Sequence, residues 1–172
     1  MITTLKDWKI FKESNNYDIK LDKQTIFDYI DFSNDKDLYP GHSDIENDFT
    51  DDYFFNTEKE ANEYVNKIMQ LFNGLPNPIP VFRCIKAKSE NDIDLEMVGE
   101  SWSYDKQSAL NFGSRNGSNF LLSAFINKEN VNWQGTIKAY VLFSNNFSDE
   151  NENEIVIDEQ DKLQNIKITK LK

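Results

Sequence analysis

Apolar side chains in the first 75 residues recur every three or four positions, which is the spacing of one face of an α-helix. The pattern predicts helices over residues 5–13, 23–32 and 57–73. The third is the best defined, because Thr57 and Glu60 form a capping box before its apolar stripe and Asn73-Gly74 follow it. Residues 34–52 are rich in Asp, Asn and Ser, and we expect a long acidic surface loop there.

From residue 76 onward the pattern changes to short runs of β-branched and aromatic residues, which indicate strands. We expect strands at 79–87, 120–127, 136–143, 154–157 and 163–171. One short helix interrupts them, with Asp105 as its N-cap and Gly113 as the residue just after its end. Helices first and strands afterwards predict one α+β domain over residues 1–172, helical at 1–75 and β-rich at 76–172.

The composition narrows the classes of function. The chain of 172 residues carries a formal net charge of −11, which disfavours a nucleic-acid target because like charges repel. With one cysteine, Cys84, and one histidine, His42, the chain has no disulfide framework and no Cys/His zinc site, so we expect no metal. The first eight residues lack the apolar run of a signal peptide, and no stretch is apolar enough to span a membrane. We therefore expect a soluble, cytoplasmic protein.

Two carboxylates, Glu152 and Glu154, stand one residue apart just before the aliphatic run Ile155–Ile157. On an extended strand they would project to the same face a few ångströms apart. Like charges at this distance repel and lower stability, so the pair suggests a chemical role for the carboxylates. The alternative is a solvated loop, since residues 148–154 are acidic and rich in Asn.

An arginine, Arg83, lies in the middle of an otherwise apolar strand. A guanidinium cannot shed its proton, so it needs a partner there. Its planar fork suits a phosphate or a carboxylate. A structural ion pair with one of the many acidic residues is the alternative.

Two serines, Ser101 and Ser103, flank Trp102 after Gly99-Glu100. If the segment is extended, both hydroxyls line one face and the indole supports them from the other. Neither serine has an evident histidine base, because His42 lies in the acidic loop, so a Ser-His-Asp hydrolase is improbable.

In the order Arg83, then Ser101-Trp102-Ser103, then Glu152-Asn153-Glu154, these signals resemble the arginine–serine–glutamate class of mono-ADP-ribosyltransferases, of phage or bacterial toxin type. The resemblance covers residues 78–172 and implies a split two-sheet β core preceded by helices. The family usually has threonine between its serines. Trp102 at that position leaves open whether Ser101 or Ser103 is the motif serine.

The resemblance implies NAD as substrate and assigns roles to individual residues. Arg83 would hold the pyrophosphate, the serines would orient the nicotinamide ribose, and Glu154 would stabilise the oxocarbenium-like transition state. Glu152 would engage a target arginine. Further contacts to NAD or to the target would come from Trp102, Phe112, Phe147 in a target-recognition turn, and Arg115 in a mobile loop at 113–117.

Two alternatives remain open at this stage. One is an NAD glycohydrolase, which passes ADP-ribose to water. The other is a non-enzymatic module that keeps the ADP-ribosyltransferase fold for binding a partner or for a place in a virion. The identity of a target protein does not follow from the sequence.

Overall fold

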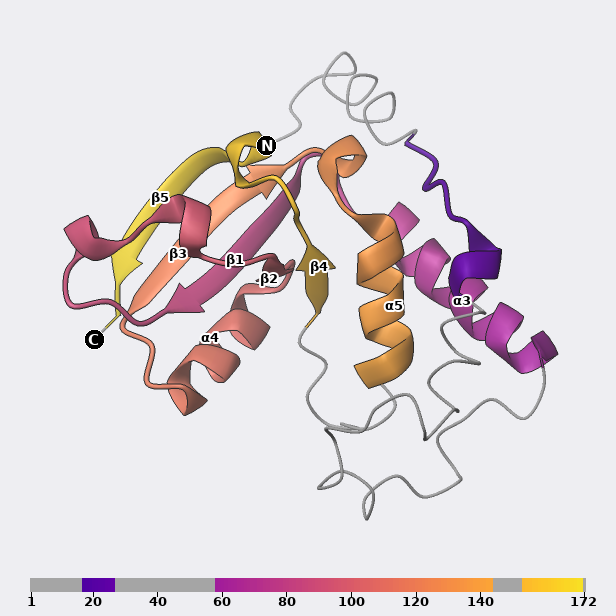
Figure 1. Ribbon diagram of the computed structural model, residues 1–172, viewed down its shortest axis with the longest axis horizontal. Coiled ribbons are helices and arrows are strands. Elements are labelled where there is room, and N and C mark those ends of the chain that lie inside the picture. The colour runs from indigo at the N-terminus through magenta and orange to yellow at the C-terminus, as the bar shows by residue number, and fades with distance from the viewer. Residues whose placement is uncertain (1–16, 27–57, 144–152, 172) are drawn as a thin grey trace, which may run out of the picture.

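The computed structural model describes residues 17–26, 58–143 and 153–171 (Figure 1). In these ranges no helix has both the length and the apolar character needed to cross a membrane. Residues 23–26 are helical, in agreement with the start of the helix expected at 23–32. The rest of that helix, the helix expected at 5–13 and the acidic loop lie outside the described residues.

Helix α3 (Glu58–Asn73) confirms the prediction at 57–73. Val65, Ile68 and Phe72 on its apolar stripe are buried. The backbone N–H of Gly74 bonds to the carbonyl of Gln70 at 3.1 Å, and α3 ends there. The side chain of Lys128 lies against this end, where Nζ donates to the carbonyl of Asn73 at 2.8 Å.

The described strands form one antiparallel sheet in the order β4-β2-β1-β3-β5, and Figure 1 shows it on the left of the molecule. Its members, in chain order, are β1 (Ile79–Ile85), β2 (Ser101–Ser103), β3 (Phe120–Ile126), β4 (Glu154–Val156) and β5 (Gln164–Lys170). Four of them match predicted strands, and β2 is the segment that was expected to be extended around Trp102. The α+β class is confirmed.

The described residues show one sheet where two were expected. The reason is that β2 pairs with β1 on one side and with β4 on the other. The pairing between β1 and β2 is limited to one residue pair, Phe82 opposite Ser103. On its other side, β1 pairs with β3 along its whole length. The sheet therefore has a broad part, β1-β3-β5, joined by one residue pair to a narrow part, β2-β4.

The strand expected at 136–143 is wrong, because this segment belongs to helix α5 (Trp133–Phe143). Asn132 caps the helix: its Oδ1 accepts from the N–H of Gly135 at 2.7 Å, and its carbonyl accepts from the N–H of Thr136 at 2.9 Å. Trp133, Ile137 and Tyr140 then recur at helical spacing and are buried. The β-branched residues of 136–143 suggested a strand, because the helix begins before this segment and its N-cap, Asn132, lies outside it.

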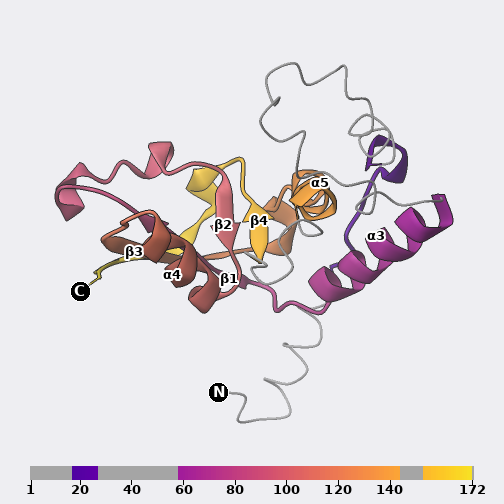
Figure 2. The ribbon, with the colours of Figure 1, turned by 90° about the horizontal axis from the view of Figure 1, so that it is seen from below.

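The helices cover different parts of the sheet. Helix α4 (Lys106–Arg115) packs against β1 and β2, α5 packs against β4, and α3 packs against α5 (Figures 1 and 2). Buried side chains of the strands and of α3 and α5 form a single core. At its centre the ring of Phe72 contacts the rings of Tyr104, Trp133 and Tyr140, with centroids 5.0–5.9 Å apart.

Short 3₁₀ turns complete the described fold. They are η3 (Glu90–Asp92) and η4 (Leu95–Met97) between β1 and β2, η5 (Lys128–Asn130) before α5, and η6 (Gln160–Lys162) between β4 and β5. The turns η4 and η6 pack against each other. The connection between β1 and β2 therefore lies against the connection between β4 and β5.

Candidate functional site

Four of the predicted site residues lie on the neighbouring strands β1, β2 and β4, namely Arg83, Ser101, Ser103 and Glu154. Ser103 is the cross-strand partner of Phe82 on β1 and of Glu154 on β4. Direct partners in an antiparallel sheet project to the same face, so the three side chains form one row across the sheet. Cys84, two residues beyond Phe82, is on this face too and lies against Gly113, so α4 covers part of the same face.

Arg83 reaches this junction from the other face of β1. By alternation its side chain belongs with that of Val81, on the face opposite to Phe82. The ladder between β1 and β2 ends at the single pair of Phe82 and Ser103, and beyond it Nη1 of Arg83 donates to the carbonyl oxygen of Ser101. Arg83 thereby bridges two strands whose backbones no longer pair.

The electrostatics of Arg83 connect it to Glu154. Burial lowers the pKa of Arg83, and the negative charge of Glu154 acts in the opposite direction. Its Nε is buried and has no hydrogen-bond partner among the described residues. The sequence allowed a phosphate or a carboxylate as the partner of this arginine. The carboxylate of Glu154 is close enough to act on its charge, and the Nε donor has no partner among the described residues.

The two serines have different environments. Ser103 is buried, its Oγ donates to the carbonyl of Asp105 at 2.9 Å, and it accepts from the N–H of Asp105 at 3.1 Å. Ser101 is exposed and lies opposite Val156. Between them Trp102 is 1% exposed, and its Nε1 donates to Oε1 of Gln160 at 3.1 Å. The expected alternation is confirmed, and Trp102 supports the strand from within the core.

The glutamate pair was expected to share one face because its middle residue would be extended. That reasoning is wrong at Asn153, which has a φ of 50° and lies just before β4. A left-handed residue breaks the alternation of a strand. Glu154 is half-buried at the start of β4, whereas Glu152 and Phe147 lie outside the described residues.

The helix after β2 differs from its prediction at its C-terminal end. Asp105 is the N-cap as expected, and its side chain accepts from the N–H of Ser108 at 2.7 Å. Gly113, however, lies inside α4, which continues to Arg115, because the absence of a β-carbon lets it pack against Cys84. Gly117, with a φ of 64°, supplies the turn instead.

Two predicted contact residues lie on α4. Phe112 is 44% exposed, and Arg115 is exposed in the last turn, where its Nε donates to the carbonyl of Asn111 at 3.5 Å. The mobile loop expected at 113–117 is thus helical in its first three residues. Both side chains belong to the helix that lies over the face of Ser103 and Glu154.

A polar network beside Glu154 was not found from the sequence. The hydroxyl of Tyr104 donates to Oδ1 of Asn153 at 2.9 Å and lies 3.1 Å from the hydroxyl of Tyr140. Nδ2 of Asn153 donates to Oγ of Ser108 at 2.9 Å. The only signal for it in the sequence was the asparagine between the two glutamates, a residue type that adopts the left-handed conformation more readily than most.

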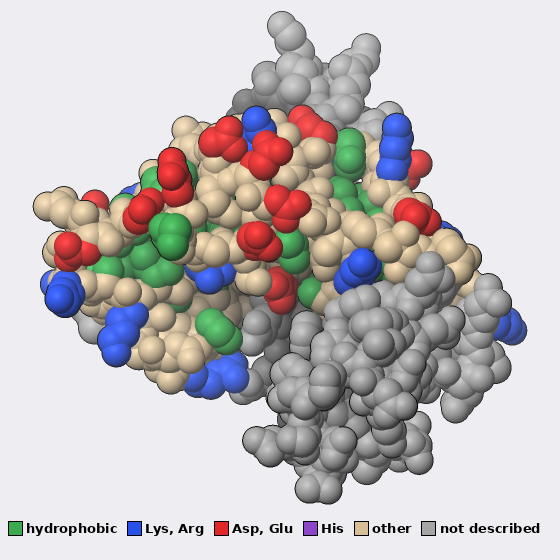
Figure 3. Space-filling model, viewed as in Figure 1, with side chains coloured by type: hydrophobic (Ala, Val, Ile, Leu, Met, Phe, Trp, Pro, Cys, Tyr) green, Lys and Arg blue, Asp and Glu red, His purple; other side chains and the backbone are tan. Residues whose placement is uncertain are grey.

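The exposed surface near the β1–β2 connection is acidic. Asp92, Asp94, Glu96 and Glu100 are exposed there, as are Asp158, Glu159 and Asp161 on the neighbouring η6 connection, and acidic side chains gather in the upper middle of Figure 3. A hollow of about 530 Å³ is lined by residues 91–96, none of which is a predicted site residue.

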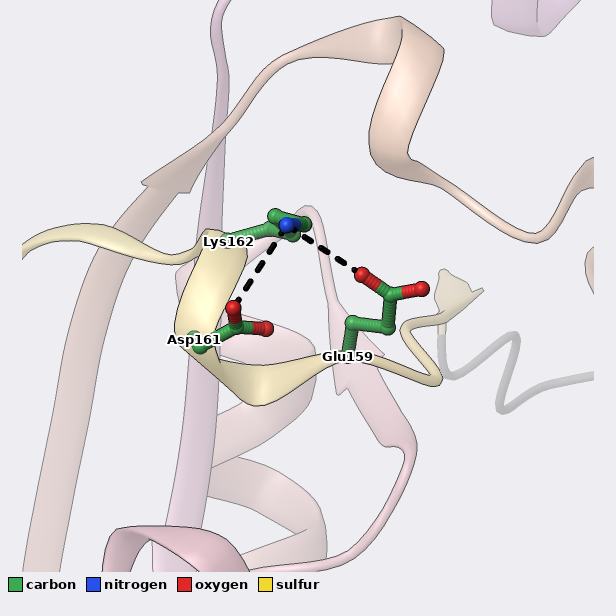
Figure 4. Close-up of polar contacts among 3 residues, drawn as sticks. All are labelled: Glu159, Asp161 and Lys162. Carbon is green, nitrogen blue, oxygen red and sulfur yellow. Dashed lines mark ion pairs between the residues drawn. The ribbon is translucent and has the colours of Figure 1, made fainter.

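Lys162 lies within this acidic surface, and its Nζ is 3.4 Å from a carboxylate oxygen of Glu159 and 3.5 Å from one of Asp161 (Figure 4). A hydrogen bond from Lys162 to Glu159 and the charge of Asp161 raise the pKa of the lysine.

In the part of the chain that the structure describes, no group of three or more His, Cys, Asp or Glu side chains is arranged to hold a metal ion. Comparison of the chain with family models, with curated proteins and with solved structures found no match. The case for a function therefore depends on the arrangement of the residues themselves.

Proposed function

We propose that the protein is an NAD-dependent mono-ADP-ribosyltransferase, which transfers ADP-ribose from NAD to a protein side chain, an arginine, and releases nicotinamide. The observation that carries the proposal is the meeting of Arg83, the Ser101–Ser103 strand and Glu154 at one junction of the sheet. These residues are far apart in the sequence, and their order is that of the arginine–serine–glutamate class.

The reaction places its main electrostatic demand on one carboxylate. As the bond between nicotinamide and ribose C1′ breaks, nicotinamide leaves with the bonding electron pair and positive charge develops on the sugar. A fixed negative charge beside the sugar stabilises that transition state more than the ground state. Glu154 supplies this charge from the start of a strand, where its backbone is held opposite Ser103.

The acceptor step completes the transfer. The nucleophilic nitrogen of the target arginine bonds to C1′ and loses a proton, for which a carboxylate is needed. In this proposal Glu152 accepts that proton and Phe147 contacts the target. Both residues precede Glu154 closely in the sequence.

Arg83 and Ser101 are assigned to the remainder of NAD. The hydrogen bond from Nη1 of Arg83 to the carbonyl of Ser101 fixes the direction of the guanidinium fork, which suits the pyrophosphate. Ser101 is exposed on the same face as Ser103, so its hydroxyl is the one that can orient the ribose, while Ser103 shapes the turn into α4. Phe112 and Arg115, on the helix that follows, would line the other side of the NAD site.

The finer fold prediction, a split two-sheet core, is part of this proposal. It is supported by the single residue pair that joins β1 to β2. In this proposal NAD binds where this ladder is interrupted, within reach of the Arg83 side chain, which already contacts the carbonyl of Ser101.

The test is to incubate the protein with NAD labelled in its adenylate part, together with a cell lysate. We expect label on a protein and release of free nicotinamide, and we expect Glu154→Gln to abolish both. Glu159→Gln is the matched control, because Glu159 is an exposed glutamate outside the junction. Equal turnover by Glu154→Gln and the wild type would contradict the proposal.

Two other outcomes identify the alternatives. Labelled ADP-ribose free in solution with no labelled protein indicates an NAD glycohydrolase. No cleavage together with no rise in melting temperature at excess NAD indicates a non-enzymatic module, because a ligand that binds only the folded state must raise its stability.

A further inference from the structure

The strand that carries Glu154 is short, so its ladder alone supplies few hydrogen bonds to fix its position. Strand β4 has three residues, and its ladder with β2 spans the same three pairs. Other contacts fix its far end: the N–H of Val156 donates to Oγ1 of Thr136 at 3.0 Å, and the N–H of Ile157 donates to the carbonyl of Glu100 at 2.8 Å. The near end, where Glu154 stands, has a different anchor.

That anchor is Asn153. Its backbone is left-handed, with a φ of 50°, and its carbonyl accepts from the N–H of Tyr104 at 2.9 Å. In its side chain, Oδ1 accepts from the hydroxyl of Tyr104 and Nδ2 donates to Oγ of Ser108, each at 2.9 Å. The residue before Glu154 is thus bound to the end of β2 and to the first turn of α4.

The network continues to the other side of the site. Oγ of Ser108 donates to Oδ1 of Asp105 at 2.9 Å, and the backbone of Asp105 holds the hydroxyl of Ser103. Ser103 is in turn the cross-strand partner of Glu154. The path closes through the peptide bond between Asn153 and Glu154, so it fixes the backbone of the glutamate and does not include its carboxylate.

We infer that Asn153 is a positioning residue, whose side-chain hydrogen bonds to Tyr104 and Ser108 hold the backbone at Glu154 in the place where its carboxylate acts. The inference deepens the proposed function and rests on it for the catalytic consequence. Its structural part, that the side chain immobilises this backbone, stands on the contacts alone. Small misplacements of a catalytic group reduce rates strongly, so the network should affect kcat more than the binding of NAD.

The test compares Asn153→Gly, Ser108→Ala and Ser108→Thr. Glycine adopts the left-handed conformation without strain, so Asn153→Gly removes the side chain alone. Ser108→Thr keeps the hydroxyl and should restore what Ser108→Ala loses. Gln107→Ala is the control, because Gln107 is an exposed residue of the same helix whose amide donates to Asn111 within α4.

Two readouts are measured on the full chain: hydrogen exchange of the Tyr104 amide by NMR, and kcat and KM for NAD. We expect Asn153→Gly and Ser108→Ala to speed exchange and to lower kcat by about tenfold with little change in KM, while Ser108→Thr and Gln107→Ala behave as the wild type. Unchanged exchange in Asn153→Gly overturns the inference whether or not NAD is cleaved. Faster exchange with an unchanged kcat overturns its catalytic part only. A wild type that does not cleave NAD overturns the proposed function instead, and exchange alone then decides the role of Asn153.

Discussion

Gly99 lies directly against the guanidinium of Arg83, so that a β-carbon at position 99 would stand 2.9 Å from Nη2. Its φ is 83°, which L-residues with a side chain rarely adopt. We expect Gly99→Ala to lower the free energy of unfolding by about 1–3 kcal/mol, from backbone strain and from displacement of Arg83. Thermal unfolding measures the change, and NAD cleavage should fall as well if Arg83 holds the pyrophosphate.

Gly117→Ala separates the two causes. Gly117 also has a positive φ, 64°, but a β-carbon there would meet nothing within 4 Å. It should therefore show the backbone strain without any effect on Arg83. Equal loss of stability and equal NAD cleavage in the two variants would mean that the contact between Gly99 and Arg83 is unimportant.

Gly113→Ala should be destabilising although alanine is the better helix former. A β-carbon at position 113 would stand 2.7 Å from Sγ of Cys84 and closer still to its Cβ, so α4 would have to move away from β1. Overpacking of this kind lowers the free energy of unfolding by about 1–3 kcal/mol. Chemical denaturation should show the loss, whereas Ser114→Ala, at an exposed position of the same helix, should change stability by less than about 0.5 kcal/mol. A more stable Gly113→Ala variant would contradict the packing of α4 on β1.

The elements that the sequence predicts well are those whose signal is local. The stripe of α3, the cap at Asp105 and the apolar runs of β1 and β3 each need only a short window of residues. Helix α5 fails this condition, because Thr136 and Ile137 look like strand residues unless Asn132 is recognised as a cap. The left-handed conformation at Asn153 is likewise set by tertiary hydrogen bonds that no local pattern contains.

The candidate site was predicted as a set of residues but not as a geometry. The distance in sequence between Ser103 and Glu154 hides that they are cross-strand partners, because strand order is a property of the whole chain. For the same reason the sequence does not show that β2 joins the two parts of the sheet, or that Arg83 enters the junction from the opposite face. The types of residue indicate the chemistry of the site, whereas their proximity depends on the pairing of strands that are distant in the sequence.

The buried lysine Lys128 should make stability depend on pH at alkaline values. Its side chain is fully buried, and burial lowers its pKa from the ordinary 10.5. The folded state therefore holds fewer protons than the unfolded state just below pH 10.5, so stability rises with pH in that window. Compared with Lys128→Met, the wild type should gain stability as the pH rises toward 10.5. Denaturant unfolding at several pH values measures the difference, and a constant difference would contradict it.

At neutral pH the same substitution should be destabilising. Lys128→Met leaves the carbonyl of Asn73, at the end of α3, without the donor that now lies 2.8 Å away. The loss of the partner of a partly buried acceptor lowers stability by about 1 kcal/mol. Lys167→Met, on the exposed surface of β5, should change stability by less than about 0.5 kcal/mol.

The last prediction separates the two serines of β2, which the sequence left equivalent. Ser103 is buried, and its hydroxyl makes two hydrogen bonds to the backbone of Asp105, so Ser103→Ala should lower the free energy of unfolding by about 1 kcal/mol or more. Ser101 is exposed, so Ser101→Ala should leave stability within about 0.5 kcal/mol of the wild type. If Ser101 orients the ribose, Ser101→Ala should nevertheless lower kcat for NAD cleavage by about tenfold or more. Thermal unfolding and NAD cleavage on the same two preparations measure both effects. A stable, fully active Ser101→Ala variant beside an inactive Ser103→Ala variant that unfolds like the wild type would assign the catalytic role to Ser103 and reverse the roles proposed for the two hydroxyls.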